Sequence, residues 1–112
     1  MRPIKFRAWE KNLRAMISVD SINFEAGLIN MELVWRTFEE IELMQYTGLK
    51  DKNGVEIYEG DIVDYFRRHK SIIEWRDGGF IIRREVDGAY ELIQDRLAGI
   101  EVIGNIYEEL LG

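Results

Sequence analysis

Apolar and polar residues alternate along much of the chain, the period of a β-strand with one covered face. Near the start, Ile4, Phe6 and Ala8 are separated by Lys5 and Arg7, and Trp9 closes the run. Further on, the same spacing places Ile73 and Trp75 on one face of a strand. The predicted strands cover residues 4–9, 16–19, 43–46, 62–66, 71–76, 80–85, 89–93 and 100–107.

Turn residues separate these strands. Asp51-Lys52-Asn53-Gly54 predicts a strong turn because Asn and Gly tolerate positive φ. Glu59-Gly60-Asp61 predicts a second turn, and Asp77-Gly78-Gly79 and Asp87-Gly88 predict tight hairpins. Short strands with turns every 8–12 residues indicate a small closed β-barrel.

The segment from residue 20 to residue 42 is less regular. Gly27 and Asn30 are expected to interrupt regular structure between short apolar pieces. Residues 39–42 fit either a helical turn or a strand entry, and we favour the strand. Residues 94–99 are expected to form a loop or one helical turn.

Composition and charge narrow the class of protein. The net charge of the 112 residues is −6, and it falls into blocks of +4, −5, −3, +4 and −6 over residues 1–18, 19–46, 47–66, 67–84 and 85–112. This acidity argues against a dedicated nucleic-acid binder, whose affinity comes mainly from phosphate neutralisation. Without cysteine, a signal-like N-terminus or a long apolar run, the chain is expected to be intracellular, with no membrane segment, cofactor or disulfide.

Three segments resemble the YopX family of phage and prophage proteins. They are KFRAW at residues 5–9 with Met16 after it, QYTGLKDKNGVEIYEGDIV at residues 45–63, and EVIGNIYE at residues 101–108. The resemblance implies a mainly β protein with an N-terminal β lobe over residues 1–42 and an SH3-type small β-barrel over residues 43–112. It also implies a gene carried by a bacteriophage or prophage, a protein in the bacterial cytoplasm, and no known catalytic residues.

The central segment has two interpretations. In one, it is a binding loop with an aromatic floor from Tyr46 and Tyr58 and an acidic rim. In the other, which we favour, glycines supply backbone freedom and Asp61 braces a turn. The spacing departs from a calcium-binding loop, since glycine is fourth and Ile62 twelfth, so no metal site is predicted. The segment comprises Tyr46, Thr47, Gly48, Asp51, Asn53, Gly54, Tyr58, Gly60 and Asp61.

A basic cluster is the second candidate surface. It combines a loop tip with two residues of the next hairpin, and it could bind a protein or nucleic acid. We favour the alternative that it pairs with acidic residues of its own chain or of a neighbour. The only histidine lies in this tip without a partner for catalysis. The cluster comprises Arg67, Arg68, His69, Lys70, Arg83 and Arg84.

The three tryptophans, Trp9, Trp35 and Trp75, are expected to fill the core or an interface. No catalytic set is identifiable. We therefore expect a non-enzymatic accessory protein that binds a host or phage protein and forms a homo-oligomer. The first alternative is a nucleic-acid-associated module that uses the basic cluster. A small-molecule enzyme using Asp51, Asp61 or Glu59 is the least favoured reading.

Overall fold

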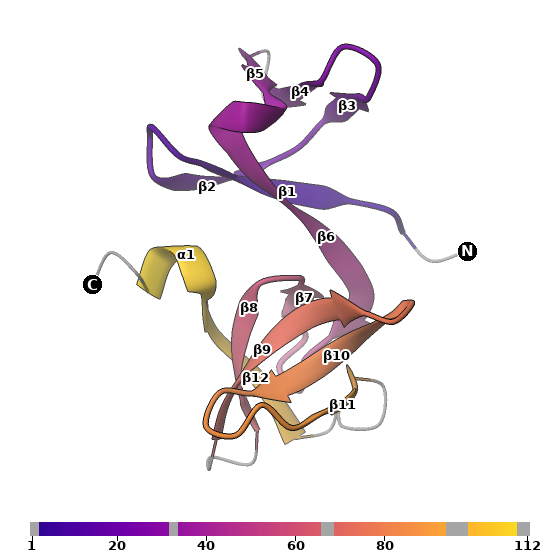
Figure 1. Cartoon of the computed structure of the whole chain (residues 1–112), viewed down its shortest axis with the longest axis vertical. Coiled ribbons are helices and arrows are strands. Elements are labelled where there is room, and N and C mark those ends of the chain that lie inside the picture. Colours follow the sequence, from indigo (N-terminus) through magenta and orange to yellow (C-terminus); the bar gives the residue numbers. More distant parts are fainter. Residues whose placement is uncertain (1–2, 32–33, 66–68, 94–98, 110–112) are drawn as a thin grey trace. The chain divides into compact units, whose positions relative to one another are not determined.

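Antiparallel strands make up most of the described part of the chain (Figure 1). The structure is a computed structural model that describes residues 3–31, 34–65, 69–93 and 99–109. The predicted mainly β class is confirmed. The strands are β1 (Phe6–Glu10), β2 (Ala15–Ser18), β3 (Ser21–Asn23), β4 (Leu28–Met31), β5 (Val34–Thr37), β6 (Ile41–Lys50), β7 (Glu56–Tyr58), β8 (Asp61–Tyr65), β9 (His69–Arg76), β10 (Gly79–Arg84), β11 (Tyr90–Leu92) and β12 (Ile100–Asn105), and the helices are η1 (Phe38–Glu40) and α1 (Ile106–Glu109).

The chain divides into two compact units, Met1–Gln45 and Tyr46–Gly112. Strand β6 belongs to both, because its first part pairs with β1 and its later part, from Tyr46, pairs with β7. The boundary predicted between residues 42 and 43 falls within the same strand.

In the N-terminal unit, β1 runs antiparallel to both β2 and β6, and β3, β4 and β5 form a separate three-stranded meander. Its core is a cluster of Ala8, Ile29, Met31 and Ile41. Ala8 and its neighbour Trp9 point to opposite faces of β1, yet both are buried. The prediction that only one face of this strand is covered is therefore wrong.

In the C-terminal unit, strands β8 to β11 form a meander and β12 returns beside β8. The hairpin between β9 and β10 closes through Asp77 and Gly78, whose φ angles of 52° and 83° suit a two-residue turn that matches the strand twist. This predicted hairpin is confirmed. The core comprises Ile57, Val63, Ile73, Phe80, Ile82, Ile93 and Ile100.

Three local predictions need correction. Asn30 lies within β4, and residues 38–40 form the 3-10 helix η1, so the strand favoured for residues 39–42 begins only at Ile41, the first residue of β6. The last strand ends at Asn105, because its Oδ1 atom accepts the N–H groups of Tyr107 and Glu108 and begins the short helix α1. Neither helix in the described ranges has the length and apolar character needed to cross a membrane. Of the predicted segment 94–99, only Gly99 is among the described residues.

Candidate functional site

Asp51 organises the turn that follows β6. Its Oδ1 atom accepts the backbone N–H groups of Asn53 at 2.8 Å and Val55 at 2.9 Å. Its Oδ2 atom accepts the N–H of Val102 on β12 at 2.9 Å. The carboxylate is 6% exposed, so it lies inside the unit and not on an acidic rim.

The protonation of Asp51 follows from these contacts. Burial raises the pKa of its carboxyl, since the charged form loses solvation. The N–H groups of Val102, Val55 and Asn53 favour the charged form and outweigh that effect, with a smaller contribution from Lys52. The pKa therefore lies below the ordinary value of 3.8, and Asp51 is a carboxylate at neutral pH.

Thr47 braces the pairing of β6 with β7. Its buried hydroxyl donates a hydrogen bond of 2.7 Å to the carbonyl oxygen of Ile57 and accepts the N–H of Leu49 at 3.2 Å. Gly48, between Thr47 and Leu49, has φ 85°, a backbone conformation that would be strained in a residue with a side chain. The hydrogen bonds of Thr47 and the positive φ of Gly48 explain why β6 is irregular at these two residues.

Asp61 and Gly60 form the second turn. The buried carboxylate of Asp61 accepts the N–H of Tyr58 at 2.7 Å. Gly60, with φ 86°, donates its N–H to Ile73 at 2.8 Å, and its carbonyl accepts the N–H of Ile106 at 3.0 Å. This turn therefore connects β9 with the start of α1.

The aromatic floor proposed for this loop is a packed pair. Tyr46 and Tyr58 are opposite each other on β6 and β7, with ring centroids 5.4 Å apart. Tyr46 is 5% exposed, which leaves little of its ring to a ligand. Asn53 and Gly54 are the exposed members of the segment. In the described ranges, no three His, Asp or Glu side chains lie close enough to hold a metal ion.

The structure describes only part of the predicted basic cluster, and its members differ in their contacts. Arg67 and Arg68 lie outside the described residues, and His69 begins β9. Lys70 is exposed. Arg83 contacts the carboxylate of Glu74 through its Nε atom, and Arg84 pairs with Asp87 at 2.7 Å. Both arginines are thus partly neutralised within the chain.

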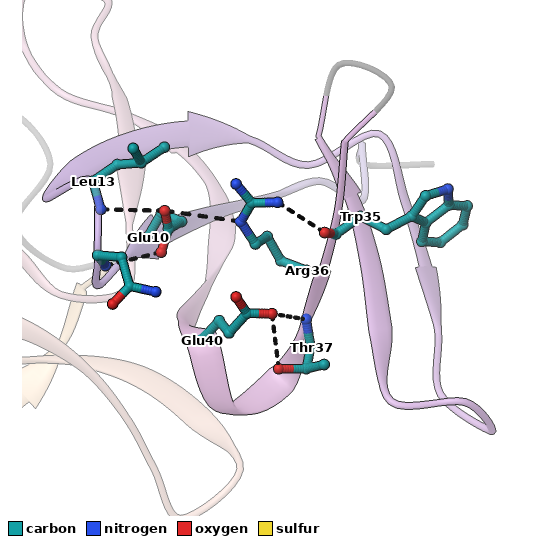
Figure 2. A network of polar contacts seen from close by, with 7 residues as sticks. Glu10, Leu13, Trp35, Arg36, Thr37 and Glu40 are labelled. Carbon is teal, nitrogen blue, oxygen red and sulfur yellow. Dashed lines mark hydrogen bonds and ion pairs between the residues drawn. The ribbon is translucent and has the colours of Figure 1, made fainter.

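The tryptophans differ in environment. Trp9 is 6% exposed, whereas Trp35 and Trp75 are each 52% exposed. Trp75 packs edge-on against Phe80 with ring centroids 4.9 Å apart. Trp35 projects away from the guanidinium of Arg36 (Figure 2). The expectation of a core or interface position therefore resolves into one buried and two half-exposed side chains.

A polar network in the N-terminal unit was missed by sequence reasoning. Glu10 is 1% exposed, and its carboxylate accepts the N–H groups of Asn12 at 2.9 Å and Leu13 at 3.2 Å (Figure 2). Arg36 brings its Nε atom to 3.8 Å from the same carboxylate and donates from Nη1 to the carbonyl of Trp35. The available signal was the spacing of Glu10 two residues after buried Ala8, which places both on one face of β1.

A second part of this network holds η1. The N–H and hydroxyl groups of Thr37 donate to Glu40 at 2.9 and 3.1 Å (Figure 2). These two bonds lower the pKa of the Glu40 carboxyl below its ordinary value. Thr37 followed three residues later by Glu40 is the capping-box spacing typical of a helix start, which explains why a helical turn forms here.

Comparisons with known proteins agree over nearly the whole chain. A family model described as YopX protein matches residues 5–111. The crystal structure of protein EF1440 from Enterococcus faecalis is 32% identical, with a TM-score of 0.72 and coverage of 100% of both chains. The crystal structure of protein yopX from Bacillus subtilis is 20% identical, with a TM-score of 0.65, and the match covers 96% of this chain and 95% of that one. No curated protein matches the chain.

Proposed function

This chain belongs to the YopX protein family, and from that premise we propose that it acts as a non-enzymatic protein-interaction module. The proposal includes a phage or prophage origin and a site of action in the bacterial cytoplasm. It also includes an SH3-type arrangement of the C-terminal unit, which the meander of β8 to β11 and the return of β12 support.

The observation that carries the proposal is the exposure of large aromatic side chains on both units. Phe24 is 73% exposed and Trp35 is 52% exposed in the N-terminal unit, and Trp75 is 52% exposed in the C-terminal unit. Leaving such side chains in water forgoes the gain from burial, and Trp is enriched among residues that dominate protein interfaces. Their exposure therefore favours contact with another protein.

The hydrogen bonds of the central segment, between Tyr46 and Asp61, favour an interaction module over an enzyme. A catalytic carboxylate must reach a substrate, and the oxygens of Asp51 face three backbone N–H groups. Asp61 is likewise buried and accepts the N–H of Tyr58. Their positions suit the bracing of turns.

A homo-oligomer remains part of the proposal, supported by the alternating charge blocks of the sequence. The nucleic-acid alternative receives less support, because Arg83 and Arg84 already contact Glu74 and Asp87. Carboxylates beside the arginines would repel phosphates and reduce the counterion release on which such binding depends.

The test is affinity capture from bacterial lysate with the full chain, with and without nuclease, read by mass spectrometry. Three variants accompany it, Trp35→Ala, Trp75→Ala and the control Val86→Ala, since Val86 is also exposed but aliphatic. We expect at least one protein that resists nuclease, is lost with one tryptophan variant and is retained with the control. Capture that disappears with nuclease would favour the nucleic-acid alternative, and capture unaffected by both tryptophan variants would contradict the proposal.

A further inference from the structure

Two phenylalanine rings lie together at one end of the β3–β4–β5 meander. Phe24 is in the turn that joins β3 to β4, and Phe38 begins η1 directly after β5. Their ring centroids are 6.2 Å apart and the planes meet at 72°, an edge-to-face contact. Phe24 is 73% exposed and Phe38 is 37% exposed, so most of the Phe24 ring and part of the Phe38 ring remain accessible to a partner.

The backbone holds this pair in a defined position. The Oδ1 atom of Asn23 accepts the N–H of Ala26 at 3.0 Å, which closes the turn carrying Phe24. Gly27 follows with φ 69°, and its carbonyl accepts the N–H of Phe38 at 3.0 Å. The two rings are therefore attached to segments joined by a hydrogen bond, and little ordering would be needed when a partner binds.

Acidic residues flank both rings. Glu25 follows Phe24 and Glu39 follows Phe38, and both are exposed. Neither carboxylate forms an ion pair with another described residue. The nearby ammonium of Lys11 lies 3.3 Å from the carboxylate of Glu42 and donates to the backbone carbonyl of Glu39, so its direct contacts are with Glu42 and with the Glu39 backbone.

We propose that the aromatic–acidic tip, defined as Phe24, Glu25, Phe38 and Glu39, docks a basic peptide segment of a partner protein. Lysine or arginine side chains would lie against the ring faces, where the quadrupole attracts a cation. The two carboxylates would pair with the same or neighbouring cations, and apolar side chains of the segment would cover the rings. The acidic block of residues 19–46, with net charge −5, favours a basic partner over an acidic one. This inference rests on the proposed function and specifies the chemistry of the partner.

The experiment uses the full chain and a short synthetic peptide of alternating arginine and leucine, with a second peptide in which glutamine replaces arginine. Binding is measured by calorimetry at low and physiological salt. We expect the arginine peptide to bind and the glutamine peptide not to bind. Phe24→Ala and the double variant Glu25→Gln/Glu39→Gln should each weaken the affinity for the arginine peptide about tenfold, the scale of a desolvated cation–π contact or charged pair. In two-dimensional NMR spectra, the peptide should shift backbone resonances of residues 23–27 and 38–40.

Matched controls separate this docking from attraction to any acidic protein. Glu85→Gln/Glu108→Gln removes the same charge from exposed positions in the C-terminal unit. Leu13→Ala removes an exposed apolar side chain from the N-terminal unit, which carries the tip. Both control variants should bind the arginine peptide with a dissociation constant within about twofold of the wild-type value. Equal losses in the control and test variants, no arginine-peptide binding, or NMR shifts confined to other residues would overturn the inference. The proposed function fails separately, through the lysate experiment, because protein capture sensitive to Trp35 or Trp75 does not depend on this tip.

Discussion

The Oδ2 atom of Asp51 accepts a hydrogen bond of 2.9 Å from the backbone N–H of Val102, 51 residues later in the chain. The adjacent Lys52 N–H donates to the carbonyl of Ile100 at 3.1 Å. A turn of the central segment thus supplies hydrogen-bond partners for β12, which is at the edge of the five-stranded sheet. Unpaired edges invite association with other chains, and this turn satisfies part of that edge.

Replacing Asp51 with Asn should destabilise the protein. The amide has one acceptor oxygen where the carboxylate has two, so at least one of the three N–H groups, which are partly buried, loses its partner. We expect the free energy of unfolding in urea to fall by about 2 kcal/mol. Exposed Glu85→Gln serves as the control and should change it by less than about 0.5 kcal/mol. A similarly small change in the Asp51 variant would contradict this role.

The contribution of Asp51 should depend on pH in one direction. Its folded-state pKa lies below the ordinary 3.8, so the ionised carboxylate stabilises the fold above that value. The stabilisation is lost as the pH falls through the folded-state pKa. We expect the difference in unfolding free energy between wild type and Asp51→Asn to be constant above about pH 5 and to narrow below 3.8. Urea titrations at several pH values measure it, and a difference that widens in acid would refute the prediction.

Gly54 should be required for its backbone conformation. Its φ is 82°, and nothing lies within 4 Å of the position where a Cβ atom would stand. The cost of Gly54→Ala is therefore backbone strain alone, and we expect about 1–2 kcal/mol of lost stability. Gly104→Ala is a matched control, because its surroundings are equally open and its φ is outside the left-handed region. Equal melting temperatures for the two variants would show that strain at Gly54 is unimportant.

The buried carboxylate of Glu10 should stabilise the N-terminal unit more than its arginine partner does. Glu10→Ala leaves the N–H groups of Asn12 and Leu13 without their acceptor and removes the charge facing Arg36, and we expect a loss of about 3 kcal/mol. Arg36→Ala keeps both N–H bonds, and the 3.8 Å ion pair is long, so the loss should be smaller. Thermal and urea unfolding followed by circular dichroism compare the two with exposed Glu39→Ala. A larger loss for Arg36→Ala would reverse this order.

Local turn chemistry explains which elements were predictable. Asp77-Gly78 encodes its hairpin because both residues reach positive φ at low cost, and the strands on either side follow. Residues 39–42 were less predictable, because Glu39 and Glu40 are compatible with strand or helix. There, the hydrogen bonds from Thr37 to Glu40 favour a helical turn.

The candidate sites were predictable only as sets of residues. Sequence could place Arg83 and Arg84 in a basic cluster, but the contacts of these side chains with Glu74 and Asp87 depend on strand register and hairpin geometry. The exposure of Phe24 could not be anticipated either, since an apolar residue beside a turn is usually assigned to the core.

The sequence by itself determined the mainly β class and most of the tight turns, because these depend on period-two alternation and on residues that tolerate positive φ, and it determined the family through three motif segments. Tertiary structure alone decided the roles of individual side chains. Asp51 meets Val102 only when β12 returns beside β8, and Glu10 meets Arg36 only when β5 lies near the end of β1. Such partners are distant in the chain, and no local preference specifies which carboxylate will be buried against backbone N–H groups and which will remain in water.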